Sequence, residues 1–159
     1  MPQKQKQKPL YLVCVNEKEH SRTALKYACA KAKARSGAVA MLYVVEPVDY
    51  NTIFSVADVI RDERRAEAQA LLETFAEVAM ERHIPAQSWV RDGMIAEEIC
   101  ACLKEHPEIT MLLLGVAADG SSNKGGVLTS LTAMLGHRYH IPLLLVPGNL
   151  TDAQIEELN

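Results

Sequence analysis

Short apolar runs alternate with longer segments of helical periodicity along the 159-residue chain. Four of the runs are almost continuously apolar, which is typical of strands that are buried on both faces of a sheet. A fifth, weaker run has the same length. Strands are therefore expected at 10–15, 38–45, 109–115 and 142–148, with the weaker one at 86–92.

Between these runs, apolar residues recur at the spacing of one helix face. The first helix is expected to begin at Ser21 as its N-cap and to end before Gly37. The stretch RDERRAE in the second helix is expected to be a solvent-exposed charged face. The remaining helices are expected at 55–83, 95–106, 126–139 and 151–158.

Strands that alternate with helices predict right-handed crossovers and a parallel sheet covered on both faces, which is a three-layer α/β/α fold. We predict the strand order 3-2-1-4-5, because it opens a crevice between the carboxyl ends of the first and fourth strands. This order would bring Asn16 near Gly115. No linker or repeat is apparent, so 1–159 is expected to be one domain, with a basic tail at 1–8 and a short C-terminal helix within 149–159.

The formal net charge is −3, and the basic tail is the only concentrated basic segment, so no nucleic-acid partner is expected. The apolar run after the tail is too short for a signal sequence or a membrane span, which predicts a cytoplasmic protein without membrane insertion. The cysteines stand among apolar residues without metal-ligand spacing, and are expected to be core residues in a reducing compartment. They are Cys14, Cys29, Cys100 and Cys102.

The glycine-rich stretch GSSNKGG, residues 120–126, nearly matches a phosphate-binding P-loop. Gly120 and Gly125 have the required spacing, but Gly126 stands where the lysine should be, so a P-loop hydrolase is not expected. Backbone N–H groups and the N-terminus of the following helix could still bind phosphate without any particular side chain. A polar connection without a ligand is the alternative.

No pattern in the sequence predicts an enzyme, because no nucleophile elbow and no recognisable His–Ser or His–Cys arrangement is present. His137 and His140 would share a helical face, but no third ligand is evident, so no metal site is expected. Glu97 and Glu98 are adjacent on a helix and would diverge. We expect them to be surface charges near the start of that helix.

Several stretches in this order resemble the universal stress protein family over about residues 9 to 148: VCVNEKEHSRTAL, YVVEP, RDGMIAEEI, and the segment from Gly115 to PLLLVPG. The resemblance implies a five-stranded parallel sheet of the adenine nucleotide alpha hydrolase-like type, usually in a homodimer. It also implies an adenine-nucleotide site in some members, and a regulatory or protective function rather than a catalytic one.

The resemblance implies roles for residues at the ends of the first two strands. Where the family has an aspartate that contacts the nucleotide, this chain has Asn16, which forms hydrogen bonds but carries no negative charge. Val44 matches an apolar position that lines the adenine pocket in nucleotide-binding members, and it is also expected to be a core residue.

Only half of the family's nucleotide motif is present after the fourth strand. Gly115 matches its first glycine, but Ala118 stands at the second position and Gly120 follows two residues later. Thr129 and Ser130 stand where the family has a Gly-Ser or Gly-Thr pair, and a Cβ at Thr129 would hinder the close approach that glycine permits.

Two function classes follow from the sequence. The first is a stress-associated regulatory protein that binds ATP or another adenine nucleotide without significant turnover, with adenine near Asn16 and Val44. The second is a dimeric interaction protein with an unidentified partner and a vestigial pocket. In either class a homodimer is expected through the apolar edge strand, between Pro142 and Pro147. The phosphates of a bound nucleotide would lie over Gly115, Gly120, Gly125, Thr129 and Ser130.

Overall fold

The structure is a computed structural model that describes residues 7–48, 54–121 and 126–159. Five parallel strands form one sheet in the order β3-β2-β1-β4-β5, so the predicted fold class and strand order are confirmed. The strands are β1 (Leu10–Cys14), β2 (Ala38–Val45), β3 (Ala86–Asp92), β4 (Ile109–Val116) and β5 (Leu143–Pro147). The helices are α1 (Glu19–Arg35), α2 (Phe54–Glu81), α3 (Ile95–Glu105), α4 (Gly126–Arg138) and α5 (Asp152–Glu157).

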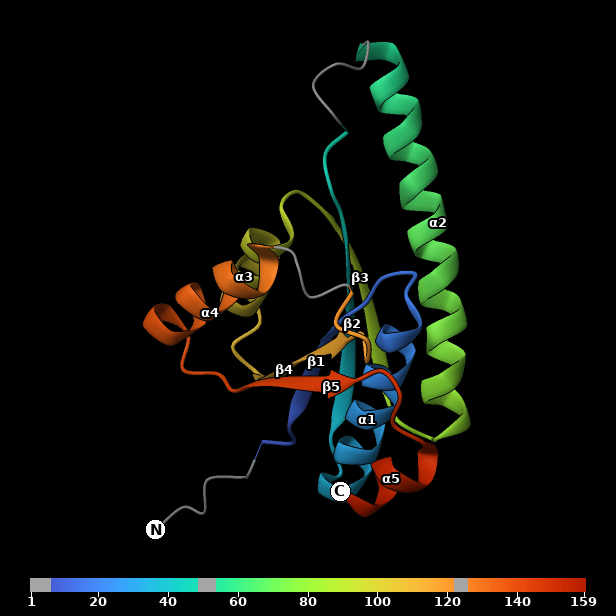
Figure 1. The fold of residues 1–159 in the computed structure, drawn as a ribbon, viewed down its shortest axis with the longest axis vertical. Coiled ribbons are helices and arrows are strands. Elements are labelled where there is room, and N and C mark those ends of the chain that lie inside the picture. Colours follow the sequence, from blue (N-terminus) through green and yellow to red (C-terminus); the bar gives the residue numbers. More distant parts are fainter. Residues whose placement is uncertain (1–6, 49–53, 122–125) are drawn as a thin grey trace.

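Helices α1 and α2 cover one face of the sheet, and α3 and α4 cover the other (Figure 1). Successive side chains of a strand point to opposite faces, so each strand contributes to both cores. In β1, Val13 packs in the core beneath α1 and α2, whereas Leu12 packs in the core beneath α3 and α4. Both residues are fully buried, which explains why the strands are continuously apolar in the sequence.

The start of α1 differs from the prediction. The helix begins at Glu19 with Lys18 as its N-cap, so the prediction of Ser21 as the N-cap was wrong. The side-chain oxygen of Asn16 accepts a hydrogen bond from the Lys18 N–H at 2.9 Å, which forms a turn before the helix. Ser21 is therefore inside the helix, where it is buried. The predicted end of the helix before Gly37 is confirmed.

Helix α2 is longer than the sheet that it covers. Its 28 residues span about 42 Å, and Figure 1 shows its N-terminal half extending beyond the carboxyl ends of the strands. This half carries Arg64 and Glu67, which therefore lie beside the ends of β1 and β2 instead of over the middle of the sheet. The overhang supplies one wall of the cavity described below.

Three of the cysteines are buried in the cores as expected, namely Cys29, Cys100 and Cys102, whereas Cys14 is half-buried at the end of β1. Within the described residues, we find no helix whose length and apolar character would let it cross a membrane.

Candidate functional site

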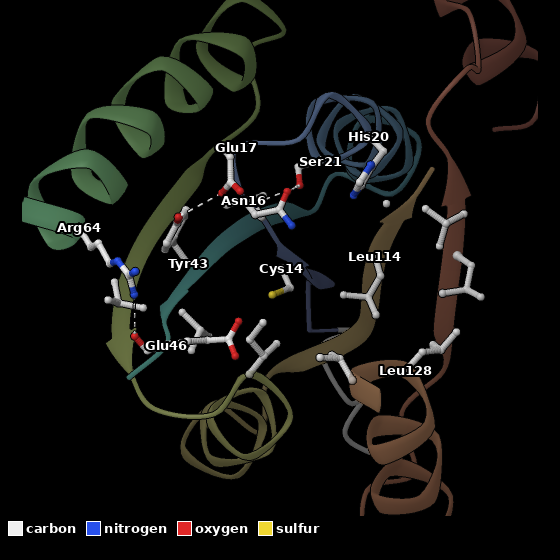
Figure 2. Close-up of a pocket in the computed structure, with 18 of the residues that line it drawn as sticks. Cys14, Asn16, Glu17, His20, Ser21, Tyr43, Glu46, Arg64, Leu114 and Leu128 are labelled. Atoms are coloured by element: carbon white, nitrogen blue, oxygen red, sulfur yellow. Dashed lines mark hydrogen bonds between the residues drawn. The ribbon is translucent and has the colours of Figure 1, made fainter. Parts of the chain in front are cut away.

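A cavity of about 670 Å³ lies at the carboxyl ends of β1, β2 and β4, where the strand order was predicted to open a crevice (Figure 2). Its volume is within the range of sites that bind small molecules, about 300–1,000 Å³. The apolar part of its lining consists of Cys14, Val15, Val44, Val45, Ile95, Leu114, Gly115, Val116, Val127, Leu128 and Leu145. The polar part consists of Asn16, Glu17, His20, Ser21, Tyr43, Glu46, Arg64 and Glu67.

The turn between β1 and α1 holds Asn16 in a fixed position. Its backbone N–H donates to the Ser21 hydroxyl oxygen at 3.0 Å, and the Ser21 hydroxyl donates to the Asn16 side-chain oxygen at 2.9 Å. That oxygen also accepts the Lys18 N–H. Because the oxygen is used by the turn, the amide nitrogen, on the cavity side in Figure 2, is the group that Asn16 offers to a ligand.

Gly115 lies where the N-terminus of α1 packs against β4. A Cβ on Gly115 would come 2.1 Å from the backbone oxygen of His20 and 2.5 Å from its carbonyl carbon. Gly148 is similarly close, since its Cβ would lie 2.7 Å from the Cβ of His20. Both glycines therefore allow α1 to lie directly on the sheet, and this contact places His20 at the cavity.

Charged and phenolic side chains meet between α2 and the strand ends. The Tyr43 hydroxyl donates to Glu17 Oε2 at 3.3 Å, and Arg64 Nη1 donates to the backbone oxygen of Glu46 at 3.5 Å. Burial raises the pKa of Tyr43, and the carboxylates of Glu17 and Glu67 raise it further, while Arg64 acts in the opposite direction. The Tyr43 hydroxyl is therefore protonated at neutral pH and acts as a donor.

An ion-pair network sets the position of α3, whose first residue, Ile95, lines the cavity. Arg91 Nε lies 2.7 Å from Glu98 Oε2, and Arg91 Nη1 lies 2.7 Å from Glu105 Oε2. These hydrogen bonds raise the pKa of Arg91. The prediction that Glu98 is a surface charge was therefore wrong, because its carboxylate is half-buried against a guanidinium from the neighbouring strand.

Three of the seven residues predicted for a nucleotide site line this cavity. They are Asn16 after β1, Val44 near the end of β2, and Gly115 near the end of β4. They come from three strands that are adjacent in the sheet, so the parallel order brings them together although they are far apart in the sequence. Their role in binding a nucleotide stays a prediction.

The other four predicted residues do not line the cavity or are outside the described residues. Thr129 and Ser130 are exposed on α4, and Gly120 precedes that helix with a positive φ of 75°. Gly125 lies outside the described residues. The helix contributes Val127 and Leu128 to the cavity instead. The predicted contacts of these four residues with phosphate stay untested.

Sequence reasoning missed seven of the eight polar lining residues, all except Asn16. For Glu17 and Glu46 a signal was present, because each is a carboxylate that follows the end of a buried strand within three residues. Arg64 and Glu67 belong to the stretch that was expected to be only a solvent-exposed face. That interpretation was incomplete, since the overhang of α2 places both beside the cavity. Tyr43 was read only as part of a strand.

The two histidines considered as metal ligands are both exposed, and His140 lies beyond the end of α4. Across the ranges that the structure describes, no group of three or more His, Cys, Asp or Glu residues is arranged to hold a metal ion.

Comparison with known proteins agrees with this architecture. The model of the universal stress protein family matches residues 11–147, and the chain therefore belongs to this family. The universal stress protein UspA from Lactobacillus plantarum is 20% identical, with a TM-score of 0.72 over 88% of this chain and 98% of that chain. No protein among the curated sequences matches this one.

Two further similar structures contain a nucleotide. A universal stress protein family protein from Arabidopsis thaliana with AMP bound is 17% identical, with a TM-score of 0.60 over 87% of this chain and 91% of that chain. The universal stress protein from Archaeoglobus fulgidus in complex with dAMP is 12% identical, with a TM-score of 0.60 over 87% and 96% of the two chains. At these identities the likeness shows the fold.

Proposed function

We propose that this protein is a stress-associated regulatory protein that binds ATP or another adenine nucleotide in the cavity and holds it without significant turnover. The observation that carries the proposal is the cavity itself, which combines an apolar wall with polar groups at the carboxyl ends of three adjacent strands. The AMP and dAMP held by two family members of the same fold support an adenine nucleotide as the ligand.

In the proposed complex the adenine ring packs against the apolar wall formed by Val44 and Leu114. The ribose hydroxyls accept hydrogen bonds from the Asn16 amide nitrogen. The phosphate lies toward the start of α4, where the backbone N–H groups of the first turn and the helix dipole favour an anion. In this arrangement the apolar ring contacts apolar side chains, and the polar ribose and phosphate contact hydrogen-bond donors.

The proposal that the nucleotide is held rather than hydrolysed rests on the side chains beside the proposed phosphate position. At the start of α4 these are Val127 and Leu128, which cannot activate water as a general base. Asn16 cannot do so either, because a neutral amide does not accept a proton. We expect the rate of ATP hydrolysis with the protein to equal the rate in buffer. Release of phosphate that rises in proportion to protein concentration would contradict this expectation.

Calorimetry with adenosine, AMP, ADP and ATP, each with and without magnesium, tests nucleotide binding. Leu128 is half-buried on the cavity wall, so Leu128→Trp should fill part of the cavity and weaken binding by more than about tenfold. The matched control is Ala133→Trp on the exposed side of the same helix, which should leave binding unchanged because Ala133 does not line the cavity. Absence of binding by all four ligands at millimolar concentration would refute the proposal.

The open edge of β5 supports the second candidate function, a homodimer that interacts with a protein partner. The Leu112 N–H donates to the Pro142 oxygen at 3.0 Å, and the Gly148 N–H donates to the Val116 oxygen at 2.9 Å. Because backbone direction alternates along a strand, the polar groups of residues 143, 145 and 147 then point away from β4. Leu145, at this open edge, is 40% exposed.

We propose that two copies pair through this edge about a two-fold axis, which would cover both rows of unpaired backbone groups. Leu145→Pro removes an outward N–H, whereas Leu145→Ala shortens the side chain and keeps that N–H. We expect light scattering to give a dimer for the natural protein and for Leu145→Ala, and a shift toward monomer for Leu145→Pro. A monomer mass for the natural protein at micromolar concentration would reject the dimer.

We also propose a cytoplasmic location. Cys14, Cys29 and Cys102 keep free thiols, which fits a reducing compartment. Fractionation of cells that express the tagged protein would test this location, and recovery from an oxidising compartment would contradict it.

A further inference from the structure

The charges around the cavity are mostly negative. Glu17 and Glu46 follow β1 and β2, and Glu67 approaches from α2, so carboxylates come from three separate elements. Arg64 is the one lysine or arginine among the described residues that line the cavity. The Arg64 guanidinium donates to the backbone oxygen of Glu46 and forms no ion pair with the Glu46 carboxylate.

The side chain of Glu46 is directed inward. Figure 2 shows its carboxylate pointing into the cavity, on the side of Cys14, while its backbone oxygen faces Arg64. Within the described residues this carboxylate forms no hydrogen bond or ion pair. A ligand in the cavity would therefore meet an unpaired carboxylate at this point.

Neither titratable ring beside the cavity offsets this charge. Burial, and then the ammonium of Lys18, lower the pKa of His20, so its imidazole is neutral at pH 7. The pKa of Tyr43 is raised, first by burial and then by Glu17, which agrees with a negative field at this end of the cavity. The histidine and the tyrosine both act as neutral groups toward a ligand.

Among the described residues, the α4 side of the cavity offers a phosphate little positive charge. Val127 and Leu128 line the cavity there with apolar side chains, and Thr129 and Ser130 are exposed. The start of this 13-residue helix supplies backbone N–H groups, which suit one phosphate group. Each additional phosphate would add negative charge that no described side chain on this wall neutralises.

We infer that the cavity prefers an adenine ligand with one phosphate or none over a triphosphate, and that the carboxylates that line it, Glu46 foremost, set this preference. The inference rests on the proposed function and specifies the ligand class of the same site. Its physical basis is repulsion between the carboxylates and the phosphates, which all carry negative charge. The three carboxylates belong to exposed residues, so the repulsion is strongest at low ionic strength.

Calorimetry at low ionic strength and without magnesium provides the test. We expect the affinity to decrease from AMP to ADP to ATP, with ATP about tenfold weaker than AMP. Added salt should narrow this difference, because it screens the repulsion. If cationic side chains instead attracted the phosphates, added salt would weaken ATP binding more than AMP binding.

Two variants with the same change of charge identify the source of the preference. Glu46→Gln should reduce the ratio of the AMP affinity to the ATP affinity by about threefold. Glu77→Gln is the control, since Glu77 is exposed on α2 and does not line the cavity, and it should leave the difference unchanged. Equal narrowing in both variants would show an effect of net charge alone and would contradict the role of Glu46.

Binding of ATP without magnesium that equals or exceeds that of AMP would overturn the inference while the proposed function stands. Loss of this tighter ATP binding in Lys124→Gln would show that the Lys124 ammonium attracts the added phosphates. Absence of binding by every ligand, adenosine included, would instead refute the proposed function, and the inference with it.

Discussion

The strand side of the cavity is closely packed, whereas the α4 side is open. On the strand side, Gly115 lies against the backbone of His20, and Ser21 is only 2% exposed and bonded to the turn. On the α4 side, Ser130 is exposed, and a Cβ on Gly126 would meet nothing within 4 Å. Predicted site residues on the strand side therefore also stabilise the fold. Substitutions there are expected to lower the stability of the protein, whether or not they change the affinity for a ligand.

The largest effect is expected for Gly115→Ala. The added Cβ would overlap the backbone of His20, which has to move away from the sheet, and we expect a loss of about 3 kcal/mol in the free energy of unfolding. Urea denaturation measures this loss. Gly126→Ala is the control on the open side and should not destabilise the protein. Equal stability of the two variants would show that the close packing of α1 on β4 is not required.

A smaller loss is expected for Ser21→Ala. This change removes the hydroxyl that accepts the Asn16 N–H and donates to the Asn16 side chain, at a cost of about 1–2 kcal/mol. Ser130→Ala removes an exposed hydroxyl from α4 and should change the stability by less than about 0.5 kcal/mol. Thermal unfolding measures the stability of both variants. An equal loss of stability in Ser21→Ala and Ser130→Ala would contradict the difference in packing between the two sides.

The raised pKa of Tyr43 predicts how the strand side responds to alkaline pH. Because the pKa is higher in the folded than in the unfolded protein, its stabilising contribution is complete below the unfolded value of about 10 and is lost as pH rises through the folded value. Spectrophotometric titration of the phenols, with Tyr43→Phe to assign the signal, measures this pKa. Glu17→Gln should lower it, because a neighbouring negative charge is removed. An unchanged pKa would contradict the contact between these residues.

The smallest effects are expected for Thr129→Ala and Ser130→Ala on the affinity for AMP. Both side chains are exposed and do not line the cavity, so the dissociation constant should change by less than about twofold. Calorimetry of each variant measures it. A loss of more than about tenfold would show that these residues contact phosphate, as the family motif implied, and that the α4 wall contributes to the site.

The sequence by itself determined the elements and their order. Continuous apolar runs separated by helical periodicity were sufficient to predict the parallel sheet, and the strand order followed from the crevice that it opens between the first and fourth strands. The short C-terminal helix was expected within 149–159, and Thr151 caps it by forming a capping box with Gln154. These features depend on residues that are close in the sequence, or on general rules of chain connection.

The tertiary structure alone decided which side chains meet. The overhang of α2 brought Arg64 and Glu67 to the cavity, and the packing of α1 on β4 placed the backbone of His20 against Gly115. The pairing of Arg91 with Glu98 likewise depends on how α3 lies beside β3. These contacts join elements whose relative position is set by side-chain packing. A shift of one element by one helical turn, about 5.4 Å, would break them. The periodicity of the sequence is the same before and after such a shift, so it does not predict these contacts.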